Sequence, residues 1–209
     1  MTARCPPRVF YRRPTLAVAR DLLGLALVHE TPAGRTAGLI VEVEAYIGES
    51  DPACHAAAGP TPRNEPMYGQ PGRAYVYLNY GLHHLVNVVT EPSGVPAAVL
   101  IRALEPVEGV DMMRVRRGVR RDGRPVAVHD LCRGPGNLTR AMGIGPAQNR
   151  ADLVRPTRRR SMDSGGLWIE HRGVQVDAVE WTARIGIRVG LEHAWRCAIA
   201  GHACVSGRT

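Results

Sequence analysis

The sequence predicts an α/β (α+β) protein in which helices flank a curved, mostly antiparallel sheet within one compact domain. At 209 residues the chain suits one packed domain and is short for two, and no Ser-, Gly- or Pro-rich linker divides it. Apolar residues make up 44% of the chain, and the single Phe leaves a core built mainly of Val, Leu, Ile and Ala. We therefore treat residues 1–209 as one domain.

The individual elements follow from local patterns along the chain. Pro14 and Thr15 precede the run LAVARDLL and Gly24 follows it, which is typical of a short helix. Alternation of apolar and polar residues between turn signals predicts strands at 25–31, 35–46, 74–80, 84–90, 97–104, 167–170, 175–179 and 185–189. Two further helices are predicted at 106–117 and 130–141.

One predicted strand carries two carboxylates on the same face. Its alternation places Leu39, Val41, Val43 and Ala45 on one side and Ile40, Glu42, Glu44 and Tyr46 on the other. Repulsion between Glu42 and Glu44, together with partial burial, would raise the pKa of at least one of them toward the range of a general base. The alternative is that both are ordinary solvent-facing carboxylates.

Tyrosines are concentrated in the same third of the chain as this strand and His55. They are Tyr46, Tyr68, Tyr75, Tyr77 and Tyr80. Aromatic faces bind planar bases by stacking, at about 1–3 kcal/mol per contact, and bind cationic bases more tightly. Tyr80 lies in NYGLHH at a predicted hairpin tip, where an exposed ring can wedge between bases. The alternatives are tyrosines that pack within the sheet and a Tyr80 that anchors its turn.

The charge of the chain is carried by arginine alone. All 27 residues counted as Lys or Arg are Arg, and the formal net charge is +8. This composition excludes a Schiff base on a lysine side chain and a Walker-type lysine, and it favours a polyanionic partner. The arginine-rich stretches 114–129 and 155–160 are predicted either to follow phosphates or to be solvated loops.

The cysteines and the hydropathy pattern predict a cytosolic protein with reduced thiols. Five cysteines occur without a CxxC pair, and no apolar stretch is long enough for a membrane span or a signal sequence. The neighbours Cys54 and His55 would suit a nucleophile or zinc ligands, but adjacent residues point apart and no second ligand pair has metal spacing. We expect no metal and no cofactor.

Eight motifs in a fixed order give the chain a recognisable signature over about residues 12–206. They are RDLLG, VEVEAY, His55 with TPRN, YVYLNYG, Asn87, LIRALEP, LCRGPGNL and RIGI. With these motifs the chain resembles the alkyladenine (3-methyladenine) DNA glycosylase family, of the single-domain type without a helix-hairpin-helix. The resemblance implies a fold like the carboxy-terminal domain of formyltransferases, with a protruding β-hairpin at Tyr80.

The resemblance also assigns roles to matching positions. It implies that Glu44 is the general base that orients the attacking water and that Arg102 helps to hold water or phosphate beside it, while Glu42 is secondary. It implies that Tyr46, His55 and Tyr77 enclose a flipped base, that Asn87 crowds the amine of normal guanine, and that Tyr80 intercalates.

The implied activity is that of a monofunctional glycosylase of base excision repair. It would flip 3-methyladenine, 7-methylguanine or hypoxanthine out of duplex DNA and hydrolyse the N-glycosidic bond, leaving an abasic site. We expect a nucleoid-associated monomer without lyase activity, because lysine is absent. Leu82 and His84 depart from the larger or aromatic neighbours common at the hairpin tip, and this departure predicts poor excision of the neutral lesions hypoxanthine and ethenoadenine.

Two other functions fit part of the sequence. A non-catalytic nucleic-acid-binding module would explain the charge and the implied fold but has no need of Glu44. A hydrolase of free nucleosides would use the same carboxylate and stacking but has no need of Tyr80 at a tip or of a +8 charge. Activity on duplex DNA but not on free nucleosides separates these hypotheses.

Overall fold

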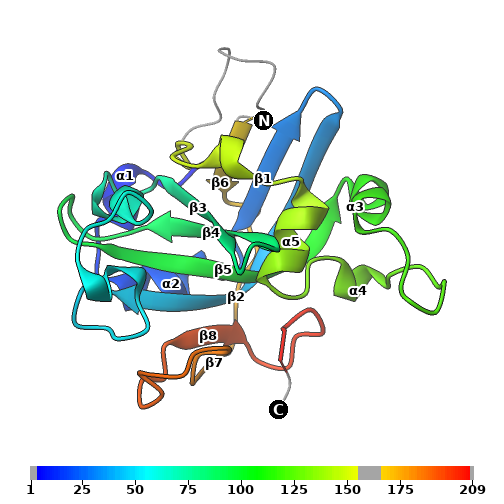
Figure 1. Cartoon of the computed structure of the whole chain (residues 1–209). Coiled ribbons are helices and arrows are strands. Elements are labelled where there is room, and N and C mark those ends of the chain that lie inside the picture. Colours follow the sequence, from blue (N-terminus) through cyan, green and yellow to red (C-terminus); the bar gives the residue numbers. More distant parts are fainter. Residues whose placement is uncertain (1–3, 155–165, 208–209) are drawn as a thin grey trace.

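A curved sheet, in which every strand pairing of the described residues is antiparallel, forms the framework of the protein (Figure 1). The computed structural model describes residues 4–154 and 166–207, so the predicted basic run 155–160 lies outside the described residues. The strands are β1 (Ala26–Thr31), β2 (Gly34–Ile47), β3 (Ala74–Asn79), β4 (His83–Val89), β5 (Ala97–Glu108), β6 (Gly166–Glu170), β7 (Val179–Thr182) and β8 (Arg196–Ile199). Their order is β3-β4-β5-β2-β1-β6, and β8 pairs with both β2 and β7. The predicted fold class is confirmed.

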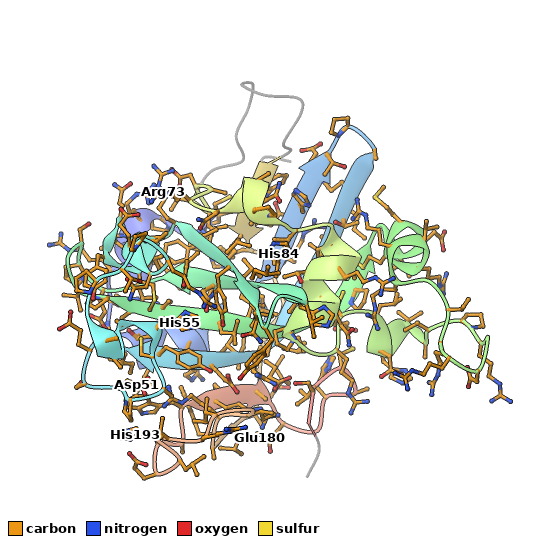
Figure 2. The ribbon with its side chains drawn as sticks, in the orientation of Figure 1. Asp51, His55, Arg73, His84, Glu180 and His193 are labelled. Carbon is orange, nitrogen blue, oxygen red and sulfur yellow. The ribbon has the colours of Figure 1, made fainter. Side chains whose placement is uncertain are left out.

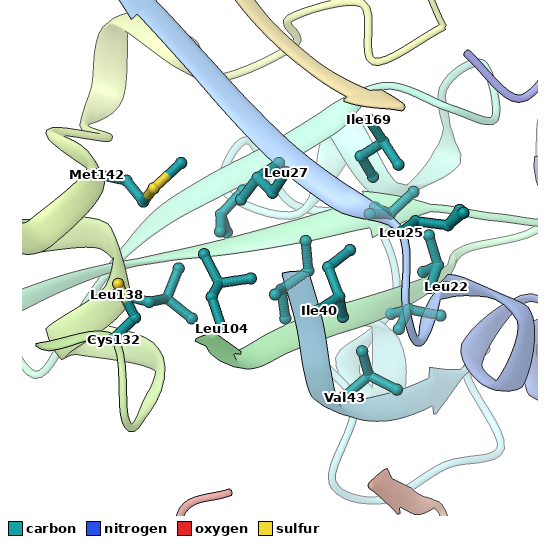
Figure 3. Packing of buried hydrophobic residues seen from close by; sticks show 14 of the residues in the cluster. Leu22, Leu25, Leu27, Ile40, Val43, Leu104, Cys132, Leu138, Met142 and Ile169 are labelled. Atoms are coloured by element: carbon teal, nitrogen blue, oxygen red, sulfur yellow. The ribbon is translucent and has the colours of Figure 1, made fainter. Parts of the chain in front are cut away.

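Short helices flank this sheet. They are α1 (Arg8–Tyr11), α2 (Thr15–Leu22), α3 (Val110–Arg117), α4 (Val128–Leu131) and α5 (Pro135–Met142), with the 3₁₀ turns η1 (His55–Ala58), η2 (Glu65–Tyr68) and η3 (Pro146–Gln148). Residues of α2 and α5 pack into the same apolar cluster as the middle of the sheet (Figure 3). Figure 3 shows Leu22, Leu138 and Met142 around Ile40 and Leu104 of that cluster.

Two of the three register shifts between β2 and β5 determine the direction of side chains around Glu42. The register shifts between Ile40 and Glu42 and again between Glu42 and Val43. The strict alternation predicted for β2 is therefore wrong before Glu42. Ile40 packs in the same cluster as Val43 and Ala45, whereas Leu39 and Val41 pack in other clusters. An extra residue in one strand reverses the faces that follow, which the sequence pattern alone does not show.

The second bulge places Arg102. Ala103 lies opposite Glu42 and Ile101 lies opposite Val43, so Arg102 is the extra residue of β5. A bulged residue is free of the regular pairing and its side chain can be redirected. Arg102 thereby reaches both carboxylates of β2.

Several predicted boundaries are wrong. β5 continues to Glu108, so α3 begins at Val110 and not at 106. The helix predicted at 130–141 is divided into α4 and α5, because Gly134 has a positive φ of 95° and Arg133 forms a bridge to Ala103 of β5. The strands predicted at 175–179 and 185–189 are replaced by β7 and β8, and residues 185–189 form a loop.

Candidate functional site

A cavity of about 360 Å³ lies where β3, β4 and β5 meet η1 and the loop after β7. Six of the seven predicted site residues line it: Tyr46, His55, Tyr77, Tyr80, Asn87 and Arg102. Its walls combine aromatic rings with a few polar groups, which is typical of a pocket for a planar ligand. The seventh predicted residue, Glu44, lies directly behind two of these lining residues.

Glu44 is held by three hydrogen-bond donors and its side chain is fully buried. Tyr46 donates its hydroxyl to Oε2 at 2.8 Å, while Arg102 at 3.1 Å and the amide of Ile185 at 2.7 Å approach Oε1. Burial raises the pKa of Tyr46, and the neighbouring Glu44 raises it further, so this phenol remains a proton donor. These contacts fix the carboxylate, and Oε2 keeps a lone pair for a further donor.

Glu42 belongs to a second, fully buried set of contacts next to Glu44. Arg102 donates from Nε at 3.0 Å and Arg196 from Nε at 2.7 Å to Oε1 of Glu42. The amide and hydroxyl of Ser206 also donate to this carboxylate. The repulsion expected between the two glutamates is therefore offset by two guanidinium groups, and Glu42 orients Arg102 from behind.

Replacing Glu42 by Ala should lower the free energy of unfolding by about 3–5 kcal/mol, because Arg196 would be left buried without a carboxylate partner and Arg102 would keep Glu44 alone. Urea denaturation measures this change. Glu108→Ala is the matched control, since Glu108 pairs with Arg172 near the surface and should cost less than about 1 kcal/mol. Equal costs for the two variants would contradict the structural role of Glu42.

Three aromatic side chains form one wall of the cavity. The ring of His55 meets that of Tyr77 edge-on at 4.5 Å, and Tyr75 stacks on Tyr77 at 5.2 Å. Nδ1 of His55 lies 3.0 Å from the hydroxyl of Tyr75. Burial lowers the pKa of His55, and Arg63 lowers it further, so the imidazole is neutral near pH 7. Figure 2 shows His55 on the side of the fold that also carries Asp51.

The TPRN motif holds this wall in place. The side chain of Asn64 is buried and donates to the carbonyls of His55 at 2.8 Å and Gly59 at 2.9 Å. Arg63 lies over the ring of Tyr77 at 5.2 Å and donates to the carbonyl of Leu78. The motif thus connects η1 to β3, which explains why it accompanies His55.

Asn87 lies on β4 opposite Tyr75 of β3. Its Nδ2 donates to the carbonyl of Tyr75 at 3.0 Å, and the residue is almost completely buried. Because Leu100 of β5 is its other neighbour, the amide is fixed between two strands with one edge toward the cavity.

Tyr80 forms the tip of the β3–β4 hairpin and is 86% exposed. Its φ of 49° is unusual for a residue with a side chain, and Gly81 follows with φ 70°. In Figure 1 this hairpin reaches toward α5, and Thr139 of α5 donates to the carbonyl of His84 at 2.6 Å. The ring is therefore presented to solvent at the edge of the cavity by a turn that is itself anchored.

Parts of the cavity were not predicted from the sequence. Pro135 at the start of α5 and the loop residues Ile185, Gly186 and Ile187 line it as well. The motifs LCRGPGNL and RIGI contain these positions, but they indicated a resemblance and no role. These two motifs were the only sequence signal for the four positions, because the loop is far in sequence from the other site residues.

The thiol beside His55 does not suit a nucleophile. Cys54 is buried, and burial raises its pKa to about 11, so little thiolate forms near pH 7. Within residues 4–154 and 166–207, no three His, Cys, Asp or Glu side chains gather closely enough to hold a metal ion. In the same part of the chain, no helix is both long and apolar enough to cross a membrane.

Comparison with known proteins assigns the chain to a family. The family model described as methylpurine-DNA glycosylase matches residues 9–203. The chain belongs to the methylpurine-DNA glycosylase family. This membership confirms the resemblance indicated by the motifs. The family acts on DNA, so DNA is the macromolecular partner of the chain. Its reaction class is the hydrolysis of an N-glycosyl bond, which is a step of base excision repair.

Relatives of the methylpurine-DNA glycosylase family match nearly the whole chain. A protein of Methanocella arvoryzae, named "Putative 3-methyladenine DNA glycosylase", is 49% identical over 205 residues, which are 97% of this chain and 96% of the relative. A protein of Chlorobium phaeobacteroides with the same name is 46% identical over 201 residues, covering 95% of this chain and 94% of that protein.

Proposed function

We propose that this methylpurine-DNA glycosylase is monofunctional and releases alkylated or deaminated purines from duplex DNA through a water molecule activated by Glu44. The observation that carries the proposal is the position of Glu44: it is buried behind an aromatic cavity and bonded to three residues that line it. The expected product is an abasic site.

The attacking water would bind to the lone pair of Glu44 that the three donors leave free. Arg102 contacts Glu44 and lines the cavity, so its guanidinium lies beside both the carboxylate and the space for the ligand. An ionised Glu44 both removes a proton from water and stabilises the positive charge that develops on the sugar. Alkylated purines leave readily, so such a site needs little acid assistance.

The flipped base would lie among Tyr46, His55 and Tyr77. Tyrosine rings attract a cationic purine such as 3-methyladenine or 7-methylguanine more strongly than a neutral one. A neutral His55 adds no repulsion to this binding, because its lowered pKa keeps it uncharged near pH 7. Hypoxanthine is neutral and therefore lacks this attraction to the tyrosine rings. This agrees with the poor excision expected from the residues at the hairpin tip.

Asn87 would reject undamaged guanine by contact with its exocyclic amine. Replacing Asn87 by Ala should therefore raise the release of normal guanine roughly 10-fold or more, because the variant removes a clash and not a favourable contact. Mass spectrometry of bases released from undamaged duplex DNA measures this change. Asn79→Ala is a control at another cavity position, and it should leave guanine release unchanged.

The proposed chemistry ends at the abasic site. Lyase activity through a lysine Schiff base requires a lysine, and the chain contains none. The proposed substrate is double-stranded DNA with one damaged purine, bound by the protein as a monomer. The exposed Tyr80 beside the cavity supports a duplex substrate, because a free nucleoside leaves no gap to fill.

Single-turnover assays on duplexes that contain 7-methylguanine, 3-methyladenine or hypoxanthine test the proposal directly. We expect base release with an intact strand until the abasic site is cleaved by alkali. The ranking of lesions gives the preference of the pocket. DNA binding without release from any lesion would favour a non-catalytic module, and release from free nucleosides at a similar rate would favour a nucleoside hydrolase.

A further inference from the structure

The segment after β7 contains an arginine that the proposed reaction leaves unused. Arg184 is the first residue of the RIGI motif, and its side chain is fully buried. Its guanidinium lies between two rings, 4.7 Å from the centre of Tyr46 and 5.0 Å from the centre of Trp195. It therefore packs directly against a tyrosine that lines the cavity.

Arg184 also forms a two-point ion pair with Asp51. The two nitrogens NH1 and NH2 approach the carboxylate oxygens at 2.6 and 2.8 Å, and NH1 also donates to the carbonyl of Ala45 at 3.1 Å. Asp51 accepts in addition from the amides of Ile47 and Ala53. Burial alone would raise the pKa of Asp51, but the hydrogen bonds from Arg184 and these amides lower it, so the pair stays ionised near pH 7.

This ion pair joins three segments that are far apart in the sequence. Asp51 lies in the loop from β2 to η1, which carries His55, and Ala45 is next to Tyr46 in β2. The loop at 185–187, which follows Arg184, lines the cavity, and the amide of Ile185 donates to Glu44 at 2.7 Å. Figure 2 places the Asp51 and His55 labels on one side of the molecule, near the C-terminal strands.

A close backbone approach completes the arrangement. Gly190 has a φ of 67°, and a Cβ atom at this position would lie 2.9 Å from NH2 of Arg184 and 3.5 Å from Asp51. The chain can pass over the ion pair only because this residue has no side chain.

We propose that the buried pair of Arg184 and Asp51 is a positioning device for the reaction, which holds the Ile185 amide on Glu44 and the ring of Tyr46 against the flipped base. The inference rests on the proposed function. Arg184 and Asp51 touch neither base nor water in this proposal; they act through Glu44 and Tyr46. A buried ion pair adds little net stability compared with apolar packing, so positioning gives a reason for its presence here.

Conservative variants at the pair test this role. Arg184→Lys keeps the charge but loses the planar two-point contact and the stacking, and Asp51→Asn keeps the shape but loses the charge. We expect each variant to lower the single-turnover excision rate by roughly 10- to 100-fold, because a displacement of about 1 Å in reacting groups has effects of this size. Affinity for a duplex with an abasic-site analogue should change less than about 3-fold, since the buried pair presents no charge to DNA phosphates.

The control is the ion pair of Arg8 and Asp152, in which one guanidinium nitrogen meets both carboxylate oxygens and which lies outside the cavity. Arg8→Lys should leave the excision rate within about 2-fold of the wild type, as expected for a pair that only contributes packing. If Arg184→Lys and Asp51→Asn also excise at the wild-type rate while folded, the positioning role is overturned.

A second comparison keeps both charges of the pair. Gly190→Ala places a methyl group against Arg184 and should lower the excision rate, with little change in DNA affinity. Gly173→Ala is its control, because Gly173 has a similar φ of 73° but open space at its Cβ. Equal excision rates in the two alanine variants would mean that displacement of Arg184 does not matter.

Hydrogen exchange separates this inference from the proposed function. In Asp51→Asn the amide of Ile185 should exchange at least about 10-fold faster than in the wild type, while the amides of β3 should keep their exchange rates. This readout needs no activity. If the wild type releases no base, the proposed glycosylase function fails and the inference fails with it; if the wild type is active and Ile185 exchange is unchanged, only the positioning role fails.

Discussion

Replacing Glu44 by Gln should lower single-turnover base excision by about 10²–10⁴-fold. Glutamine has nearly the same shape, and its carbonyl oxygen can still accept from Arg102 and the Ile185 amide. Its amide nitrogen has no lone pair to accept a proton from water. The variant therefore removes the base from the reaction while it preserves most contacts of a buried position.

The experiment compares rates with enzyme in excess over a duplex that contains 7-methylguanine. Binding to a duplex with an abasic-site analogue should stay within about 3-fold of the wild type, because Glu44 is buried and makes no contact with phosphates. Glu30→Gln is the control, since Glu30 is a solvent-exposed carboxylate at the end of β1. Wild-type excision by Glu44→Gln would remove Glu44 from the mechanism, and equal losses in both variants would indicate a general effect of charge.

Replacing Tyr80 by Ala should weaken binding to abasic-site duplexes and slow excision from duplex DNA by roughly 5- to 100-fold. A stacked aromatic side chain contributes about 1–3 kcal/mol per base, and a tenfold change corresponds to about 1.4 kcal/mol. Tyr80 is 86% exposed, so the variant loses almost no packing in the free protein. Its effect should therefore appear only when the ring fills a gap in the duplex.

The decisive comparison uses a damaged base that is already extrahelical at a single-strand end. Tyr80→Ala should excise this base at the wild-type rate, since no gap has to be filled. Tyr80→Phe is the control that keeps the ring and should behave as the wild type on both substrates. An equal loss on the duplex and on the single-strand end would show that Tyr80 acts on the pocket itself and not as a wedge.

The sequence predicted those parts of the fold that depend on local patterns. The hairpins of β1 with β2 and of β3 with β4, helix α2 and strand β6 lie close to their predicted positions. The C-terminal strands were misplaced because the run at 185–189 alternates like a strand but contains Gly186, which has a positive φ, and ends before Gly190, which also has one. The bond from the Ile185 amide to Glu44 and the ion pair of the preceding Arg184 with Asp51, and not strand pairing, hold this run.

The site shows the same division. Alternation in one strand predicted that Glu42, Glu44 and Tyr46 share one face. In the structure Arg102 contacts both glutamates, and Tyr46 donates a hydrogen bond to Glu44. That Arg102 could reach both glutamates was not visible, because it depends on an extra residue in β5. The catalytic and base-binding roles of these residues stay predictions until the variants are measured.

The sequence by itself determined the family, the antiparallel fold class and the group of carboxylates, tyrosines and histidine that meets in the cavity. These features rest on residue identity, short-range alternation and motif order. Only the tertiary structure decided which groups bind the carboxylates: Arg102 through a bulge, Arg196 and Ser206 from the C-terminal region, and the Ile185 amide from a loop held by Arg184 and Asp51. Such contacts join residues up to 164 positions apart, and no local pattern records a pairing of that range.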